Sequence, residues 1–143
     1  MRVFVDTNIF LDFIQPDRKF TESAKAILNA AEARMFEMYL STQSIIDSAF
    51  VLRKNGFDYN RFSKVLRCLL SFAKVVGIDE LDMLWALDHY SGDFEDDMQY
   101  ASAYNNACDF FITRDEKLQK LNSPINPLIV ITPEEFVSKM TSD

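Results

Sequence analysis

Four aspartates stand where their carboxylates could act together. Asp6 and Asp115 each follow a short apolar run, Asp96 lies near the start of a predicted helix, and Asp47 lies within another. Carboxylates gathered in one place repel each other, and their pKa values rise unless a cation intervenes. Hard divalent ions prefer oxygen ligands of this kind. The pattern therefore predicts a site for Mg²⁺ or Mn²⁺.

Each of these acids also has a purely structural interpretation. Acids in or beside a first helical turn cap free N–H groups and interact favourably with the helix dipole. This interpretation stays open for Asp93, Glu95, Asp96, Asp97 and Asp115. Asp47 shares a helical face with Lys54 and could be a solvated acid paired with it. Helical periodicity alone does not choose between Asp96 and Asp97.

An alternation of strands and helices would bring the acids together. Apolar runs predict strands at 3–5, 35–40, 75–76, 110–112 and 128–131. Helical periodicity and capping signals predict helices at 8–13 (capped by Asn8 and ended by Pro16), 21–33, 41–54, 60–72, 79–89, 93–108 and from 133 onward. This order predicts an α/β fold, a three-layer α/β/α sandwich with a mainly parallel five-stranded sheet. Right-handed crossovers would then place the carboxyl ends of the strands, and with them Asp6 and Asp115, on one edge.

The charges are distributed unevenly along the chain. The net charge is −7, and residues 75–113 contain nine acids and no lysine or arginine, whereas residues 1–74 contain eleven basic and eight acidic residues. Passive binding of nucleic acid depends on neutralising phosphates, which an acidic protein does poorly. A protein of this composition that handles nucleic acid needs something to offset its acids locally, and a divalent cation would do so.

The composition predicts one soluble domain. The chain has 143 residues, without a glycine- or serine-rich linker, so we expect a single domain over residues 1–143. No apolar run approaches the roughly 18 residues of a membrane span, and there is no room for a signal peptide before the first strand. We therefore expect a cytoplasmic protein with no membrane contact and reduced Cys68 and Cys108. The single histidine, His89, excludes chemistry that needs a histidine pair.

The same residues resemble the PIN domain family, and most closely its VapC-type toxin nucleases. The opening Val3-Phe4-Val5-Asp6-Thr7-Asn8 is similar to the family's strand followed by Asp-Thr-Asn. Residues 93–101 resemble its Asp-Phe-Glu-Asp-Ala segment, in which the second acid of the Glu-Asp pair is catalytic, and this maps to Asp96. Residues 111–115 resemble its Ile-Thr-Arg-Asp segment, and residues 132–136 its common ending. Asp47 stands where the family usually has glutamate, one methylene longer.

The resemblance implies a metal-dependent endoribonuclease that is the toxin of a toxin–antitoxin pair. It implies single-stranded RNA as substrate, attacked by a metal-activated water, and it also implies a homodimer and an antitoxin that blocks the site. The implied catalytic residues are Asp6, Asp47, Asp96 and Asp115, of which Asp6, Asp96 and Asp115 would hold Mg²⁺ or Mn²⁺. The implied substrate-positioning residues are Thr7 and Thr113, which would contact the water or phosphate, and Asn8, which would orient Asp6.

Basic residues around the Asn55-Gly56 turn are candidates for RNA contact. They are Arg53, Lys54, Arg61, Lys64 and Arg67. Phe57 and Tyr59 are available to stack on bases. A solvated helix face, or an apolar surface for a protein partner, is the alternative for this region.

Two other functions fit parts of the pattern. A catalytically inactive PIN-fold module that binds RNA or a protein is favoured by the unusual Asp47. A phospho-accepting receiver-like domain also gathers acids at strand ends, but it needs adjacent acids near the first strand and a lysine after the last. Here Asp6 stands alone and Ile131 is followed by Thr132-Pro133.

Overall fold

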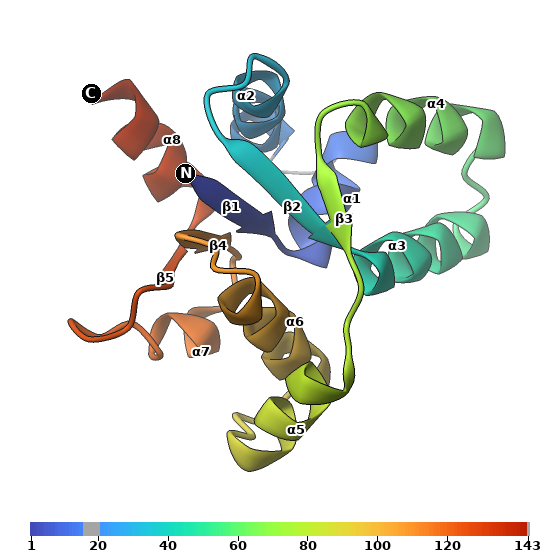
Figure 1. Ribbon diagram of the computed structural model, residues 1–143. Coiled ribbons are helices and arrows are strands. Elements are labelled where there is room, and N and C mark those ends of the chain that lie inside the picture. Colours follow the sequence, from blue (N-terminus) through green and yellow to red (C-terminus); the bar gives the residue numbers. More distant parts are fainter. Residues whose placement is uncertain (16–20, 143) are drawn as a thin grey trace.

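Five strands form one sheet at the centre of the molecule (Figure 1). The computed structural model describes residues 1–15 and 21–142. The strands are β1 (Arg2–Val5), β2 (Glu37–Ser41), β3 (Lys74–Val76), β4 (Phe110–Ile112) and β5 (Ile129–Ile131). Their order is β3-β2-β1-β4-β5, and every neighbouring pair is parallel. The predicted α/β fold with a five-stranded sheet is confirmed, and among the described residues this sheet is parallel throughout.

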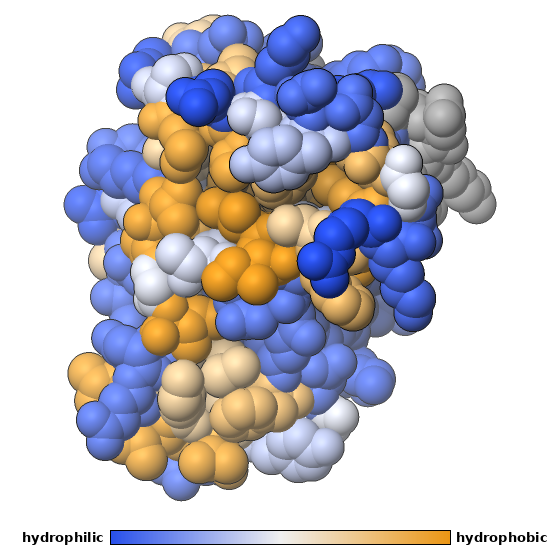
Figure 2. All heavy atoms as spheres, turned by 90° about the vertical axis from the view of Figure 1, so that its right-hand side faces the viewer, coloured by the Kyte–Doolittle hydropathy of each residue, from blue (hydrophilic) through white to orange (hydrophobic). Residues whose placement is uncertain are grey.

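Helices cover both faces of the sheet (Figure 1). They are α1 (Thr7–Ile14), α2 (Thr21–Glu32), α3 (Thr42–Lys54), α4 (Tyr59–Leu70), α5 (Glu80–Asp88), α6 (Phe94–Asn105), α7 (Glu116–Gln119) and α8 (Pro133–Thr141). The face that carries α3 and α4 shows several apolar side chains among polar ones (Figure 2). In the described part of the chain, no helix is both long and apolar enough to cross a membrane.

The alternating side chains of β1 serve two separate cores. Val3 and Val5 are fully buried in an apolar cluster with residues of α1, α2, α4 and α8. Phe4 is fully buried in the second cluster, where its ring centroid lies 5.4 Å from that of Phe111 and where Tyr100 of α6 packs. A strand buried on both faces must be a nearly continuous apolar run, as this one is. After the exposed Arg2 at its start, the next polar side chain, Asp6, can therefore appear only where the strand ends.

The chain changes direction across the sheet next to β1. From β1 it moves outward to β2 and β3, and then it crosses back so that β4 lies on the other side of β1. Parallel sheets bind ligands at the carboxyl ends of their strands where such a reversal occurs. In this protein that point lies between the ends of β1 and β4, where Val5 is paired with Ile112.

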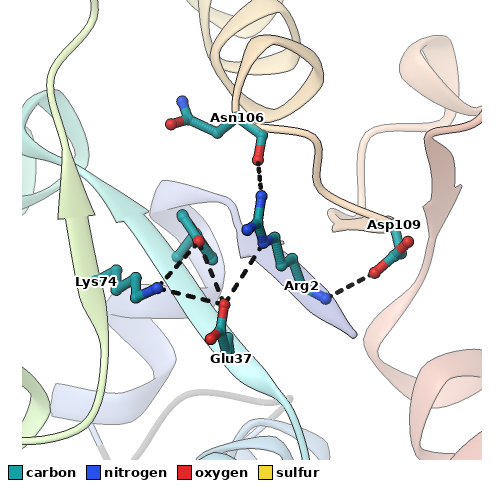
Figure 3. Close-up of polar contacts among 6 residues, drawn as sticks. Arg2, Glu37, Lys74, Asn106 and Asp109 are labelled. Atoms are coloured by element: carbon teal, nitrogen blue, oxygen red, sulfur yellow. Dashed lines mark hydrogen bonds and ion pairs between the residues drawn. The ribbon is translucent and has the colours of Figure 1, made fainter.

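At the other end of the sheet, where the strands begin, acidic side chains lie beside basic residues (Figure 3). Glu37 Oε2 lies 3.5 Å from Arg2 Nε and 3.4 Å from Lys74 Nζ. Asp109 accepts a hydrogen bond of 2.7 Å from the backbone N–H of Arg2. The positive charge of Lys74 holds the pKa of Glu37 below its ordinary value. Glu37 is therefore balanced by two basic side chains, whereas Asp109 is held by a backbone N–H group.

Two local predictions differ from the structure. Asn8 does not cap α1, because the helix begins one residue earlier and Asp6, with an extended backbone, is the N-cap that accepts from Thr7 N–H. The helix predicted over 93–108 ends at Asn105, because Ala107 adopts a positive φ of 53° that turns the chain toward β4. The predicted helix end at Pro16 lies outside the described residues.

Candidate active site

Asp6 occupies the point where β1 ends beside β4. The residue is 5% exposed, and its carboxylate accepts hydrogen bonds of 2.6 Å from Thr7 N–H and 2.8 Å from the Thr113 hydroxyl. Burial raises the pKa of Asp6, although these two hydrogen bonds oppose the effect. Thr113 Oγ1 in turn accepts a hydrogen bond of 3.0 Å from the backbone N–H of Asp115. Thr113 thus connects the first acid with the segment that carries the last.

Asp96 and Asp115 form a pair that shares a hydrogen bond between their carboxyl groups. Burial, followed by this hydrogen bond to Asp115, raises the pKa of Asp96 to about 8. The same hydrogen bond lowers the pKa of Asp115. Two carboxyl groups in contact cannot both ionise freely, so the pair holds one proton near neutral pH. We place this proton on Asp96, because the desolvation cost falls chiefly on that side chain.

Of this pair, Asp115 also caps a helix, whereas the cap at the start of α6 is Asp93 and not Asp96. Asp93 is the N-cap of α6 and accepts from the N–H groups of Glu95 and Asp96, and Asp115 is the N-cap of α7 and accepts from Lys117 N–H at 2.9 Å. Capping and convergence on one site are therefore compatible, since one oxygen of a carboxylate can cap a helix while the other faces the acids.

Asp47 and Glu95 form a second acidic pair near Asp6. Asp47 lies in α3 and accepts a hydrogen bond of 2.8 Å from Gln43 Nε2, and its carboxyl group is also hydrogen-bonded to Glu95. Burial, followed by the contact with Asp47, raises the pKa of Glu95 to about 7, and the charge of Asp6 adds to this. Asp47 Oδ2 is buried and receives no hydrogen bond from an N–H or hydroxyl group of the described residues. The lysine partner considered for Asp47 is replaced in the structure by Gln43.

Asp97 points away from these acids. It is fully buried and accepts two hydrogen bonds from Ser91, one of 2.8 Å from the backbone N–H and one of 2.6 Å from the hydroxyl. These bonds fasten the turn before α6 onto the helix. The geometry therefore places Asp96 at the edge of the sheet with Asp6 and Asp115, and it gives Asp97 a structural contact.

The three predicted substrate-positioning residues lie in different surroundings. Thr113 is fully buried and donates its hydroxyl hydrogen to Asp6. Thr7 is half-buried, with its hydroxyl between Ser44 and Gln99. Asn8 is exposed on the first turn of α1, and Asp6 takes its hydrogen bonds from Thr7 and Thr113 instead. The substrate roles of these residues stay predictions.

A model of the PIN domain family matches residues 2–117, a span that includes Asp6, Asp47, Asp96 and Asp115. The chain belongs to the PIN domain family. The resemblance seen in the sequence motifs is thereby confirmed for the family, whose members are nucleases. No curated protein is similar enough in sequence to match this PIN domain.

Solved structures of toxin–antitoxin proteins share the fold of this PIN domain. VapC20 of Mycobacterium tuberculosis, a Sarcin-Ricin loop cleaving toxin, is 12% identical with a TM-score of 0.66, over 87% of this chain and 99% of that one. A toxin–antitoxin complex from Klebsiella pneumoniae gives 21% identity and a TM-score of 0.63, over 92% and 97%. VapBC2 of Rickettsia felis, bound to a DNA fragment from its promoter, gives 14% identity and a TM-score of 0.65, over 92% and 98%.

The predicted RNA-contact residues of the PIN domain lie on α3 and α4, and all are exposed: Arg53, Lys54, Arg61, Lys64 and Arg67. The two helices enclose a hollow of about 380 Å³, lined by Ala49, Phe50, Leu52, Arg53, Phe57, Tyr59 and Phe62. The guanidinium of Arg61 lies 5.5 Å from the centre of the Phe57 ring. Basic and aromatic side chains thus occur together around this hollow.

The donor set suits a hard divalent cation. Among the described residues, no three acidic, histidine or cysteine side chains already stand in a cluster that could hold a metal ion. The acids instead meet in two pairs, and burial raises the pKa of Asp6, Glu95 and Asp96, which favours binding of protons by these groups. The sequence from 75 to 113 supplies no lysine or arginine to compensate them. A cation that displaced these protons would relieve the repulsion with oxygen ligands only.

Glu95 is the member of this site that sequence reasoning missed. Its position in the first turn of α6 suggested only a favourable interaction with the helix dipole. The contact with Asp47 joins residues 48 positions apart, so no local pattern announces it. The available signal was the adjacency of Glu95 to Asp96 in the first turn of this helix.

Proposed function

We propose that this PIN domain is a divalent-metal-dependent endoribonuclease that cleaves single-stranded RNA and is the toxin of a toxin–antitoxin pair. One observation carries the proposal: the pairs Asp96–Asp115 and Asp47–Glu95 lie close to buried Asp6, and burial raises the pKa of Asp6, Glu95 and Asp96. Membership of a nuclease family and a fold shared with VapC toxins support the same conclusion.

The proposed chemistry assigns a task to each acid. Mg²⁺ or Mn²⁺ held by Asp6, Asp96 and Asp115 would polarise the phosphate and lower the pKa of a bound water. Thr113 keeps the Asp6 carboxylate in place and joins it to Asp115. Asp47 of α3, which lies against Glu95, would add a further carboxylate to the site on a side chain one methylene shorter than glutamate.

We propose that the RNA strand runs from the acids along α3 toward the basic residues. Arg53 lies six residues beyond Asp47 on α3, which corresponds to about 9 Å along the helix axis. Arg53, Lys54, Arg61, Lys64 and Arg67 would contact phosphates of the strand. Exposed Phe50 and Tyr59 would stack on its bases.

We propose two protein partners. An antitoxin would cover the site, as suggested by the toxin–antitoxin complex from Klebsiella pneumoniae that shares the fold. A second copy of the chain would pack on α5, where Leu81, Leu84 and Leu87 are each at least half exposed. Apolar side chains repeated at this spacing form one side of a helix that gains stability when covered. A cytoplasmic location stays a prediction.

The alternative function is a PIN-fold module that binds RNA or a protein without cleaving. It is favoured by Asp47, whose carboxyl group is already engaged by Gln43 and Glu95. In that case the acids would be an inherited arrangement, and the basic and apolar surface of α3 and α4 would perform the function.

Cleavage of RNA by the purified protein separates the two functions. We expect a single-stranded RNA to be cut when Mn²⁺ or Mg²⁺ is present, to give 5′-phosphate and 3′-hydroxyl ends, and to stay intact with EDTA. Asp6→Asn purified in the same way is the control for a contaminating nuclease. Binding of RNA without cleavage under every metal tested would favour the binding module.

The pH dependence of stability follows from the raised pKa of Asp96. In the metal-free folded protein Asp96 keeps its proton up to about pH 8, whereas the ordinary value is 3.8. Between these values the folded state binds more protons than the unfolded chain, so the free energy of unfolding falls as pH rises. We expect a lower melting temperature at about pH 8.5 than at about pH 6 in EDTA, and Asp96→Asn should reduce this difference.

The affinity for a metal ion should increase with pH, whereas the stability decreases, because a cation must displace the proton. The affinity for Mg²⁺ should rise by about tenfold per pH unit in this interval if one proton is released per ion. Titration calorimetry in buffers of different ionisation enthalpy counts the released protons. An affinity independent of pH would contradict the proton-sharing pair.

A further inference from the structure

Behind the acids, a largely buried ring of hydrogen bonds joins three helices. Gln99 Nε2 on α6 donates to Thr7 Oγ1 on α1 at 2.8 Å, and Thr7 Oγ1 lies 2.8 Å from Ser44 Oγ on α3. Ser44 Oγ closes the ring by donating to Gln99 Oε1 at 3.0 Å. Gln99 is 1% exposed and Ser44 is fully buried. Buried polar groups arranged in this way have to satisfy one another.

The hydrogens of the ring can be assigned from the contacts. The single hydroxyl hydrogen of Ser44 goes to Gln99, so Thr7 must donate in its contact with Ser44. Gln99 donates to Thr7, and all three bonds therefore run in the same direction, which strengthens each of them. Ser41 at the end of β2 adds a fourth donor, 3.0 Å from Ser44 Oγ. The Thr7 hydroxyl hydrogen is thus committed to the ring.

Each member of the ring is a close neighbour of one acid in the sequence. Thr7 follows Asp6, Ser44 precedes Asp47 by three residues, and Gln99 follows Asp96 by three residues. Helical residues three apart lie on the same side of a helix. The position of each ring residue therefore sets the position of the acid beside it.

The ring also crosses between the two apolar cores. Side chains of α1 and α3 pack in the cluster around Val3 and Val5, whereas α6 packs in the cluster around Phe4. Apolar contacts within each cluster do not fix α6 against α1 and α3, because the sheet separates the clusters. The directional contacts of Gln99 provide that link at the edge of the sheet where the acids lie.

We propose that Gln99 is a positioning residue. Through Thr7 and Ser44 it holds α1, α3 and α6, and with them the neighbouring acids Asp6, Asp47 and Asp96, at the separation that a divalent ion requires. The inference rests on the proposed metal-dependent function, and it extends that function to a residue outside the acids. Gln99 is buried, so it acts through the acids and not by contact with RNA.

Replacing Gln99 by methionine tests the proposal, because Met has a similar length but cannot form the ring. We expect the affinity for Mn²⁺, measured by calorimetry without RNA, to fall about 10- to 100-fold, the usual effect of losing a group that supports a metal ligand. The kcat for RNA cleavage should fall by a similar factor. KM should change less, because the RNA-contact surface on α3 and α4 is unaltered.

Ser44→Ala opens the same ring from α3 and should give the same pattern. Because both substitutions break one unit, the double variant should lose no more than either single variant. Ser102→Ala is the matched control, since Ser102 is fully buried on the same helix and its hydroxyl lacks a hydrogen-bond partner among the described residues. Ile27→Val in α2 controls for a loss of stability in the core.

The possible results test the positioning role of the ring and the proposed function independently. If the wild-type protein binds Mn²⁺ and cleaves RNA, but Gln99→Met and Ser44→Ala do both equally well, the positioning role is wrong and the function stands. Additive effects in the double variant would also overturn the positioning role. So would an affinity of Gln99→Met for Mn²⁺ that is no lower than that of Ile27→Val, when the two variants lose the same amount in melting temperature. Should Gln99→Met fail to fold, Ser44→Ala decides. A wild-type protein that neither binds Mn²⁺ nor cleaves RNA refutes the function itself.

Discussion

Replacing Asp6 by asparagine is expected to abolish RNA cleavage while leaving the fold intact. The loss of the most buried carboxylate of the candidate site should remove several kcal/mol of metal-based charge stabilisation, which corresponds to a rate decrease on the order of a thousandfold. Asparagine caps a helix as well as aspartate does, so the contact with Thr7 N–H at the start of α1 can persist. The measurement is the single-turnover cleavage rate, with the circular dichroism spectrum as a check on folding.

The neighbouring acids of α6 provide the comparison. Asp96→Asn should behave like Asp6→Asn, because Asp96 shares its hydrogen bond with Asp115 at the edge of the sheet. Asp97→Asn should keep cleaving, but it should lose about 1–3 kcal/mol of stability, because the hydrogen bonds from Ser91 to a buried charge are weakened. An inactive Asp97→Asn beside an active Asp96→Asn would show that the site has been assigned to the wrong acid.

Replacing Asp12 by alanine should destabilise the protein by about 3–5 kcal/mol, the usual cost of removing one partner from a buried ion pair. Asp12 is fully buried in α1, and its Oδ2 accepts a hydrogen bond of 2.5 Å from Arg114. Arg114 also lies 3.9 Å from Glu134 of α8, so the pair connects α1 with the segment just before Asp115. Such a loss is a large share of the 5–15 kcal/mol that stabilises a typical domain. Urea denaturation measures it.

An exposed ion pair is the matched control for this prediction. Lys25 lies 3.7 Å from Glu22 on α2, and both side chains are more than half exposed. Lys25→Ala should change the stability by no more than about 0.5 kcal/mol, because water already screens such pairs. If Asp12→Ala cost as little as Lys25→Ala, the buried pair would have no special role in holding α1.

The fold could be predicted from the sequence because its central strand leaves little choice. Val3, Phe4 and Val5 are all fully buried, so the run before Asp6 is apolar without interruption. The alternation of such runs with amphipathic helices then specifies a parallel sheet. Helix ends were harder to predict, as Asn105 shows. The turn beyond it depends on a positive φ at Ala107, which is an alanine and not the glycine that usually marks such a position.

The candidate site could be predicted only in part. Strand ends indicated where Asp6 and Asp115 lie, because the topology of a parallel sheet determines that edge. Periodicity could not separate Asp96 from Asp97, since the distinction depends on whether the turn at Ser91 reaches back to the helix. The contacts of Gln99 with Thr7 and Ser44 span 92 and 55 residues. Hydrogen bonds between side chains so far apart leave no repeating pattern in a single sequence.

The short outer strands of the sheet have a consequence for how this protein associates. A second chain adds to a sheet by pairing with a long, flat edge of free backbone groups. Here β3 and β5 are each only three residues long, and β3 begins with the charged Lys74. Neither edge offers a template for a further strand, so extended β-assemblies should be slow to grow from the native state. Specific partners are then left with helical surfaces, where recognition depends on side chains and not on the backbone.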